Sequence, residues 1–343
     1  MNRRRKTGLV LSGVVAGLLS LSAPLLAAGP ANKVAEPRVW PPPPAAARVT
    51  TEGSFATPAD LGIRPTWFAR VANLIAGGNR GTEKLVKPFG VAVDEAGNIC
   101  LTDTGTNVVW FFDRGRRRCS RWEQIDKVRF VLPVAVAKAD GIIYVADSGL
   151  GQVVAFDENG RTRFRIVGQF TRPAGLALAG EKLYVADSGA HCVLIFDRQG
   201  RSLGRFGARG VAPGTFNFPT HVAVDPSGRI YVTDAMNSRV QVFDDQGGFL
   251  SELGSIGDGS GHFSRPKGVA VDSFGHVYVA DALFDNVQVF DRAGQFLLDL
   301  GSSGAAAGEF WMPAGIAISR DNRIFVADAY NGRVQMLRYI GQP

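Results

Sequence analysis

The sequence has few of the residues from which metal centres and covalent cross-links are built. Three cysteines and four histidines occur among 343 residues, and no Cys-x-x-Cys-His motif is present, which excludes covalent attachment of a c-type haem. No cysteine and histidine have zinc-finger spacing. There is also no His-Glu-x-x-His motif, phosphate-binding loop or serine-nucleophile motif. The sequence therefore predicts no metal, no cofactor and no catalytic residue of a familiar kind.

The excess of positive charge lies mostly at the N-terminus. The formal net charge is +7, but residues 1–28 hold four basic residues and no acid, so 34 basic and 31 acidic residues remain beyond them. A net charge of +3 over that remainder is not the strong basic footprint of a nucleic-acid-binding domain. No nucleic-acid partner is expected.

A single long apolar run occurs at residues 9–26, directly after Arg3, Arg4, Arg5 and Lys6. A charged start, an apolar middle and small residues at 27–29 are typical of a secretory signal peptide over residues 1–28. The segment predicts a secreted, periplasmic or cell-envelope protein with no membrane span once the signal is cleaved. The run is close to spanning length, so a retained anchor is the alternative.

Residues 29–47 are interpreted as a proline-rich linker. The four consecutive prolines at 41–44 favour a stiff, extended polyproline II spacer. Trp40, just before them, either docks on the domain that follows or belongs to a mobile tail.

The rest of the chain is built from a repeat, which is clearest at residues 267–300. Four apolar runs are separated by turns, and two of these turns, Ser273-Phe274-Gly275 and Arg292-Ala293-Gly294, supply the glycine that a tight hairpin needs. Short strands rich in β-branched and aromatic residues predict an antiparallel four-stranded meander. The aspartate that closes the second strand recurs at intervals of 44, 40, 47, 47 and 47 residues, at Asp103, Asp147, Asp187, Asp234, Asp281 and Asp328.

Six such copies predict an all-β fold, a six-bladed β-propeller of four-stranded antiparallel blades. The blades are expected near residues 85–118, 130–167, 171–206, 217–253, 264–300 and 311–340. An aspartate that every blade carries is expected to cap backbone N–H groups in its own blade rather than to join a catalytic ring. Cys100 takes a strand position where other copies have tyrosine, which predicts a buried thiol, and a Cys100–Cys119 bridge is the alternative in an oxidising compartment.

The repeat resembles the NHL repeat. The pattern is Pro-x-Gly-Val-Ala-Val-Asp, a turn, Ile-Tyr-Val-Ala-Asp, a loop with Asn and Arg, and Val-Gln-Val-Phe-Asp, and residues 266–291 and 313–335 match it almost throughout. The resemblance covers roughly residues 85–340 and implies a six-bladed β-propeller. The functions of the family are diverse, so the fold alone does not say what is bound.

The last repeat lacks a fourth strand. Residues 48–55 resemble one, so the N-terminal segment is expected to pair with residues 333–337 and to close the ring, which removes two open strand edges. Between this strand and the first blade, residues 67–75 have apolar side chains at a helical spacing. They predict a short helix, with a strand as the alternative.

The amidating lyases of the NHL family place metal-binding histidines at the mouth of the central channel, and the resemblance implies where such ligands would lie. The six matching positions here are Gly90, Ala135, Gly175, His221, Gly268 and Gly315. A zinc site needs three or four ligands, and one histidine does not make one. A divergent metal-dependent lyase, similar to the peptidyl-hydroxyglycine amidating lyases, or a hydrolase therefore remains only the alternative function.

Departures from the repeat indicate a binding surface on one loop face. The loop after the second strand has asparagine in blades four and six, but Leu150 in blade two and Phe284 in blade five. Other apolar residues fall on the same expected face, among them Phe216, Phe218, Phe263 and Phe310. Packing between blades is the alternative explanation for these aromatics. The candidate binding residues are Leu150, Met236, Phe284, Trp311, Tyr330 and His221.

A second candidate is a cluster of arginines after the third strand of blade one. Guanidinium groups suit phosphate or an acidic partner, and a solvated turn is the alternative. The cluster is expected on the face opposite the loop face and comprises Arg114, Arg116, Arg117, Arg118 and Arg121.

The sequence thus predicts a secreted, non-enzymatic propeller that binds a protein or a small ligand through its loop face, as a monomer or as part of a cell-envelope complex. It resembles secreted bacterial NHL propellers associated with envelope assemblies, including multihaem cytochrome systems.

Overall fold

A computed structural model describes residues 37–64 and 84–341. The expected signal peptide and the predicted helix at residues 67–75 lie outside these ranges. The chain divides into two units, Met1–Glu36 and Pro37–Pro343, and the described residues all belong to the second. No helix among them is long and apolar enough to cross a membrane.

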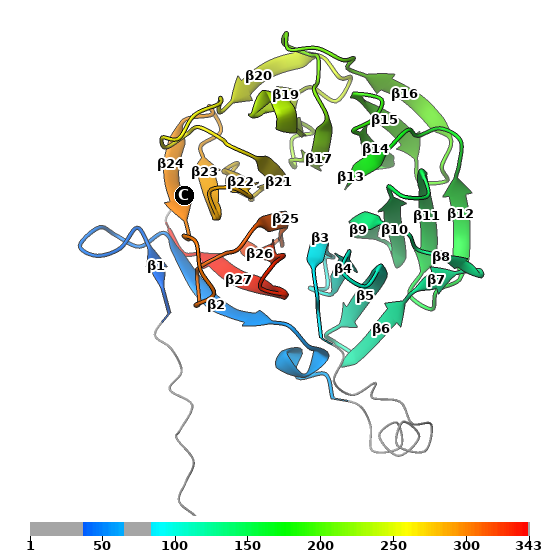
Figure 1. The fold of residues 1–343 in the computed structure, drawn as a ribbon, viewed down its shortest axis with the longest axis horizontal. Coiled ribbons are helices and arrows are strands. Elements are labelled where there is room, and N and C mark those ends of the chain that lie inside the picture. Colours follow the sequence, from blue (N-terminus) through cyan, green and yellow to red (C-terminus); the bar gives the residue numbers. More distant parts are fainter. Residues whose placement is uncertain (1–36, 65–83, 342–343) are drawn as a thin grey trace, which may run out of the picture. The chain divides into compact units, whose positions relative to one another are not determined.

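The second unit contains six antiparallel sheets arranged in a ring (Figure 1). Blade one consists of β3 (Pro88–Val93), β4 (Ile99–Asp103), β5 (Val108–Asp113) and β6 (Arg118–Trp122). Blade two consists of β9 (Pro133–Ala139), β10 (Ile142–Asp147), β11 (Gln152–Asp157) and β12 (Thr162–Ile166). Blade three consists of β13 (Pro173–Ala179), β14 (Lys182–Asp187), β15 (Cys192–Asp197) and β16 (Ser202–Phe206). A small hairpin of β7 (Gln124–Ile125) and β8 (Val128–Arg129) lies between blades one and two.

Blades four to six repeat the pattern. Blade four consists of β17 (Pro219–Val224), β18 (Ile230–Asp234), β19 (Arg239–Phe243) and β20 (Phe249–Leu253). Blade five consists of β21 (Pro266–Val271), β22 (Val277–Asp281), β23 (Asn286–Phe290) and β24 (Phe296–Leu300). Blade six consists of β25 (Pro313–Ile318), β26 (Arg323–Asp328) and β27 (Arg333–Tyr339), together with β2 (Val49–Phe55) and β1 (Val39–Trp40). The predicted six-bladed propeller is confirmed.

The ring is closed by the N-terminal strand, as the missing fourth strand of the last repeat predicts. In Figure 1, β2 lies beside β27 in a sheet of order β1-β2-β27-β26-β25. The pairing is antiparallel and runs from Val49 opposite Tyr339 to Phe55 opposite Val334. Chain segments almost 300 residues apart therefore complete one blade.

The proline segment is not the extended spacer that its composition favours. The chain turns back through residues 41–48, and β1 pairs with β2 as a fifth strand. Trp40 is buried in a core cluster with Leu300 and Phe310. Burying an indole stabilises the hairpin on the order of 2–3 kcal/mol, which the local preference of proline for an extended chain does not outweigh. Trp40 therefore docks on the propeller, and the prediction of an extended linker is wrong for residues 37–47.

The repeated aspartates cap backbone groups. The carboxylate of Asp281 accepts hydrogen bonds from the main-chain N–H groups of Ser264 at 2.7 Å, Arg265 at 3.0 Å and Leu283 at 3.0 Å. All six equivalents are fully buried. Each one ties the loop after its second strand to the connection that enters the same blade, which confirms the predicted structural role.

The core lies between neighbouring blades. Phe216, Phe263 and Phe310 are completely buried there, so for these three the packing explanation is correct. Cys100 and Cys192 are buried free thiols, and the considered Cys100–Cys119 bridge does not form. Burial raises the pKa of the Cys100 thiol.

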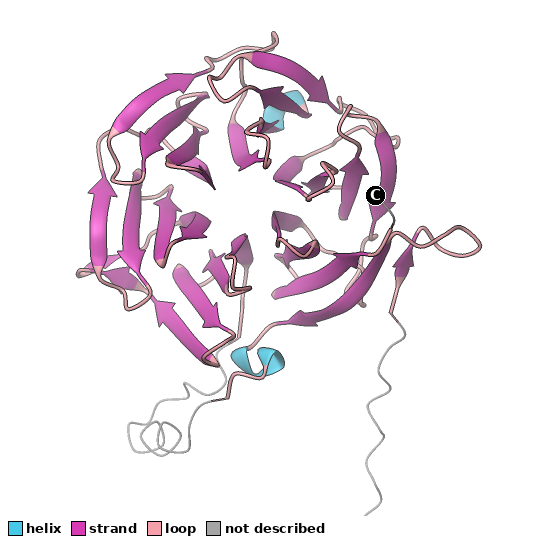
Figure 2. Cartoon of the chain, turned by 180° about the vertical axis from the view of Figure 1, so that it is seen from behind, coloured by secondary structure: helices cyan, strands magenta, loops and turns pink. Residues whose placement is uncertain are grey.

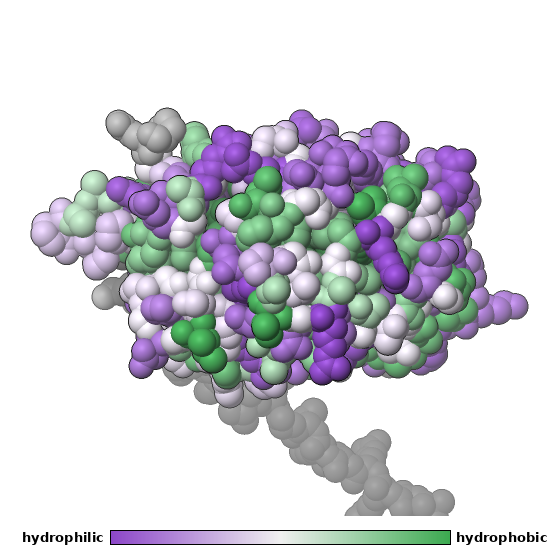
Figure 3. Space-filling model, turned by 90° about the horizontal axis from the view of Figure 1, so that it is seen from above, coloured by the Kyte–Doolittle hydropathy of each residue, from purple (hydrophilic) through white to green (hydrophobic). Residues whose placement is uncertain are grey.

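The two faces of the ring differ in their connections. Figure 2 shows the ring from the side opposite to that in Figure 1. We call the loop face the side with the loops after each second strand and the connections between blades. The other side, the turn face, carries the tight hairpin turns after each first and third strand. Polar and apolar side chains are interspersed on the side of the ring seen in Figure 3.

Candidate functional site

A cavity of about 470 Å³ opens at the centre of the loop face, where the innermost strands begin. We call it the mouth pocket. Its apolar wall includes Phe89, Phe218 and Met236, and Met236 lies in a short 3-10 helix after β18 (η2, Ala235–Asn237). Below it the channel narrows to a space of about 40 Å³ lined by Gly90, Ala135, His221 and Gly315 with aliphatic neighbours. The pocket therefore opens toward the loop face, and the channel is much narrower beneath it.

Glycine at the channel positions lets adjacent innermost strands approach closely. A Cβ atom on Gly175 would lie 2.7 Å from the carbonyl oxygen of Thr220 and 2.8 Å from the Cα atom of His221. A Cβ atom on Gly268 would lie 2.5 Å from the carbonyl oxygen of Ala314. Only a residue without a side chain fits there, and the imidazole of His221 is the largest side chain among the six channel positions.

The mouth pocket is positively charged. Arg172, Arg265 and Lys267 line it, and no aspartate or glutamate is among the described residues that do so. The Lys267 ammonium lies 5.1 Å from the ring centre of Phe89. Burial, followed by the charges of Arg265 and Lys87, lowers the pKa of Lys267 to about 8. The carboxylates of Asp187 and Asp281 are close by, but they accept the main-chain N–H groups of Arg172 at 2.8 Å and Arg265 at 3.0 Å and form no ion pair with the three cationic side chains.

His221 forms the floor of this pocket. Both of its ring nitrogens are buried and, among the described residues, have no hydrogen-bond partner, and the same holds for the hydroxyl of Thr220. The ring stacks on Phe89 with centres 6.2 Å apart. Burial and then the charge of Lys267 lower the pKa of His221 to about 3, so the imidazole is neutral at physiological pH. A neutral imidazole offers one donor and one acceptor.

The other three histidines are engaged elsewhere in the fold. The Nδ1 atom of His191 accepts the Phe218 N–H at 3.2 Å, and His262 and His276 lie within hydrogen-bond distance of Ser255 and Asp272. Within residues 37–64 and 84–341, no group of three or more His, Cys, Asp or Glu side chains is placed to hold a metal ion. The residues of the channel therefore do not fit the zinc centre that the amidating-lyase alternative implies.

Two further aromatic residues stand exposed on the loop face of blade six. Trp311 is 53% exposed and Tyr330 is 50% exposed, with ring centres 5.6 Å apart. The Lys87 ammonium lies 4.6 Å from the Tyr330 ring centre. We call Trp311, Tyr330 and Lys87 the aromatic patch. The Trp311 main chain is held by Asp328, which accepts its N–H at 2.8 Å, so the indole is presented from a fixed backbone.

The remaining predicted loop-face residues differ in exposure. Met236 is 65% exposed beside the mouth pocket. Leu150 and Phe284 are half-buried, and the main-chain N–H of each donates to the capping aspartate of its blade. In the same loop of blade five, Leu283 is 53% exposed. The sequence comparison considered only the position where blades four and six have asparagine, so it did not identify Leu283.

The arginine cluster lies on the turn face and along the outermost strand of blade one. Arg114, Arg116 and Arg117 are exposed in the turn, and Arg118 and Arg121 belong to β6. Arg116 is within 3.4 Å of Asp113 and 3.5 Å of Glu158. The guanidinium of Arg121 contacts Glu123 and lies over the Trp110 ring. Two of the five arginines are thus partly neutralised, and anion binding here stays a prediction.

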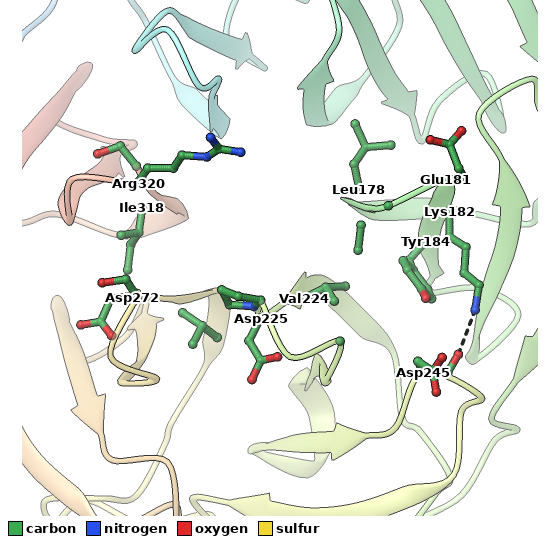
Figure 4. A pocket seen from close by; sticks show the side chains of 17 residues that line it. Leu178, Glu181, Lys182, Tyr184, Val224, Asp225, Asp245, Asp272, Ile318 and Arg320 are labelled. Carbon is green, nitrogen blue, oxygen red and sulfur yellow. Dashed lines mark hydrogen bonds between the residues drawn. The ribbon is translucent and has the colours of Figure 1, made fainter.

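At the turn face, the end of the channel carries the opposite charge to the mouth pocket. A cavity of about 900 Å³ at that end of the channel is lined by Glu181, Asp225, Asp245 and Asp272, with Lys182 and Arg320 as its cations. Figure 4 shows these side chains around the opening, with the Lys182 ammonium 3.3 Å from the carbonyl oxygen of Asp245. The two ends of the channel therefore attract ligands of opposite sign.

Comparison with known proteins supports the fold. No curated protein sequence matches the chain. A gluconolactonase from Xanthomonas campestris is 18% identical, with 86% of this chain and 98% of that chain covered and a TM-score of 0.58. Hydrazine synthase from Kuenenia stuttgartiensis is 14% identical over 75% and 97%, with a TM-score of 0.54. A catalytically inactive variant of virginiamycin B lyase from Staphylococcus aureus, solved with quinupristin, is 12% identical over 76% and 97%, with a TM-score of 0.54. At these identities the likeness is one of fold alone.

The family comparison agrees with the repeat. The NHL repeat model matches residues 170–196, 216–243 and 310–336, which fall in blades three, four and six. Together with the six blades of the ring, these matches show that the chain is a six-bladed β-propeller with NHL repeats in three of its blades.

Proposed function

We propose that this propeller is an exported binding protein that recruits a partner through its loop face and catalyses no reaction. The observation that carries the proposal is the aromatic patch. Trp311 and Tyr330 are each about half exposed, on a backbone held by a buried aspartate. Exposed aromatics on a rigid scaffold add little to folding, and tryptophan and tyrosine are enriched among residues that dominate binding interfaces.

The channel supports binding better than catalysis. General acid–base chemistry needs a group whose pKa lies near the working pH and a partner that orients it. His221 has a pKa near 3 and no hydrogen-bond partner among the described residues. The buried aspartates are committed to capping the loops, as Asp281 is.

Export and the cell envelope belong to the same proposal. The signal-like residues 1–28 support it, and so does the resemblance to secreted bacterial NHL propellers of envelope assemblies. Proteins of such assemblies, including multihaem cytochrome systems, are therefore the first partners to test.

The test is capture of partners from the native envelope fraction with the immobilised mature protein. Replacing Trp311 and Tyr330 together by alanine should weaken capture by at least about 100-fold, because losing one interface hot spot typically costs roughly 2 kcal/mol or more. Thermal stability should change little, since both side chains are half exposed. Leu250→Ala, on the outermost strand β20 and 50% exposed, is the matched control. Equal capture by the double variant and the wild type would refute the patch as the binding surface.

A lyase or hydrolase is the competing function, because two of the structural relatives are named a lyase and a gluconolactonase. Purified protein is expected to carry no stoichiometric zinc and to show no amidating-lyase activity, since one histidine cannot replace three or four ligands. Elemental analysis of the wild type and of His221→Ala checks this. About one zinc per chain that is lost in the variant would favour the lyase.

A further inference from the structure

We propose that the mouth pocket binds a small organic anion, in which a carboxylate or phosphate group is joined to an aromatic or other apolar body. The inference rests on the proposed binding function and names the chemical class of a ligand for the same loop face. Arg172, Arg265 and Lys267 hold the anionic group, and Phe89, Phe218 and Met236 contact the apolar body.

Unpaired charge is the first argument. Among the described residues, none accepts a hydrogen bond from, or forms an ion pair with, the side chain of Arg172, Arg265 or Lys267, and all three side chains line the same pocket. Burial first, and then the like charges of Arg265 and Lys87, lower the pKa of Lys267. An anion that joins the three groups counteracts both effects.

The second argument is the floor of the pocket. Both nitrogens of His221 and the hydroxyl of Thr220 are buried without a partner in the described part of the chain. Buried polar groups are almost always hydrogen-bonded, so a ligand polar atom at this depth supplies what the fold leaves unmet. His221 is neutral, so it adds a donor and an acceptor but no charge.

Size and shape are the third argument. A volume of about 470 Å³ lies within the range of small-molecule sites, which are mostly apolar with a few placed polar groups. The channel narrows to about 40 Å³ beneath His221, so a ligand enters and leaves on the loop face. The carboxylates around the opposite opening, such as Asp225 and Asp272, repel an anion from that side.

The cationic set has a sequence origin that the repeat makes visible. The residue before the proline that opens each blade is basic in blades one, three and five (Lys87, Arg172 and Arg265) and apolar in blades two, four and six (Leu132, Phe218 and Met312). The residue after that proline is Lys267 in blade five, whereas blades three and six have alanine there. Because apolar residues also occur at this position, the fold does not require a basic residue there, and Arg172 and Arg265 both line the mouth pocket.

The test uses 2-naphthoate and its neutral analogue 2-naphthamide as probes, titrated into the full mature protein by calorimetry. Naphthoate should bind at least tenfold more tightly than the amide, because only the acid carries a charge. Lys267→Gln should weaken naphthoate binding at least tenfold. Lys182→Gln, at the turn-face opening, should leave it unchanged. Melting curves check that each variant is folded.

The pH dependence separates this site from a general cationic surface. Among the described residues, the charges of Arg265 and Lys87 act on Lys267, the charge of Lys267 acts on His221, and Arg172 lines the same pocket. The guanidinium groups stay charged, and His221 stays neutral. Naphthoate affinity should therefore fall as pH rises from 7 to 9.5 through the pKa of Lys267 near 8, where the ammonium loses its proton. In Lys267→Gln this fall should disappear.

Any of four results would overturn the inference. The acid and the amide could bind equally well, or inorganic phosphate could displace naphthoate at a similar concentration. Lys267→Gln could leave naphthoate binding unchanged, or the Trp311→Ala, Tyr330→Ala double variant could lose naphthoate binding. The last result would place the probe on the aromatic patch. Partner capture that depends on the patch while naphthoate fails to bind would refute the pocket ligand and leave the proposed function standing. If naphthoate binds the pocket but partner capture does not depend on the patch, the proposed function is refuted and the pocket ligand stands.

Discussion

A chain that lacks residues 29–56 should no longer unfold in one cooperative transition and should aggregate. The deletion removes β1 and β2, and with them the buried side chains of Trp40, Val49 and Phe55. Losing a buried apolar side chain of this size costs on the order of 3 kcal/mol, so three together approach the whole stability of a typical domain, about 5–15 kcal/mol. The edge of β27 also becomes available for pairing between molecules.

Calorimetric melting and size-exclusion chromatography of the truncated and full mature proteins measure this effect. Phe55→Ala should show a partial loss, on the order of 3–5 kcal/mol. Ser54→Ala, on the exposed side of the same strand, should melt like the wild type. A peptide of residues 37–56 added in trans should restore cooperativity, because it supplies the missing strand. A truncated protein that is monomeric and melts normally would show that the ring closes without β2.

Replacing Asp234 by alanine should destabilise the protein by about 3–5 kcal/mol, because removing one member of a buried ion pair leaves the other uncompensated. The Asp234 carboxylate is fully buried. It accepts the N–H of Asn217 at 2.6 Å and is bonded by the side chains of Asn237 at 2.8 Å, Arg239 at 2.9 Å and Gln241 at 3.1 Å. Arg239 is itself nearly buried, and among the described residues only the half-exposed Glu252 remains as its acidic partner.

The free energy of unfolding in urea measures the loss. Asp244→Ala is the matched control from the same blade, because Asp244 caps an exposed turn through the N–H groups of Gln246 and Gly248. It should cost about 1 kcal/mol. Similar losses in both variants would mean that the buried network contributes no more than an ordinary turn cap.

Most of the fold could be predicted because its signals are local and repeated. Alternating apolar residues, glycine-containing turns and an aspartate at a near-constant interval describe each blade without reference to any other. Closure could also be predicted, because residues 48–55 match the strand that the last repeat lacks. The proline segment was predicted wrongly for the opposite reason: its course depends on a core site for Trp40 that other blades build.

The candidate site could be predicted only in part. His221 stood out as the one histidine at the channel positions, and Trp311, Tyr330 and Met236 stood out as apolar residues in loops. Their exposure could not be predicted, because Phe310 and Trp311 are neighbours in the sequence, yet the first is fully buried and the second half exposed. Only the packing between blades decides which of two adjacent aromatics faces the solvent.

The sequence by itself therefore determined the blade, the number of blades and the strand that closes the ring, because hydrophobic periodicity and turn chemistry act over a few residues at a time. The tertiary structure alone decided where charge accumulates. Arg172 and Lys267 lie in different blades, almost 100 residues apart in the sequence, and line one pocket because the ring brings the start of each innermost strand to the same channel mouth. A repeat predicts its own strands, but the composition of a channel depends on all the blades that surround it.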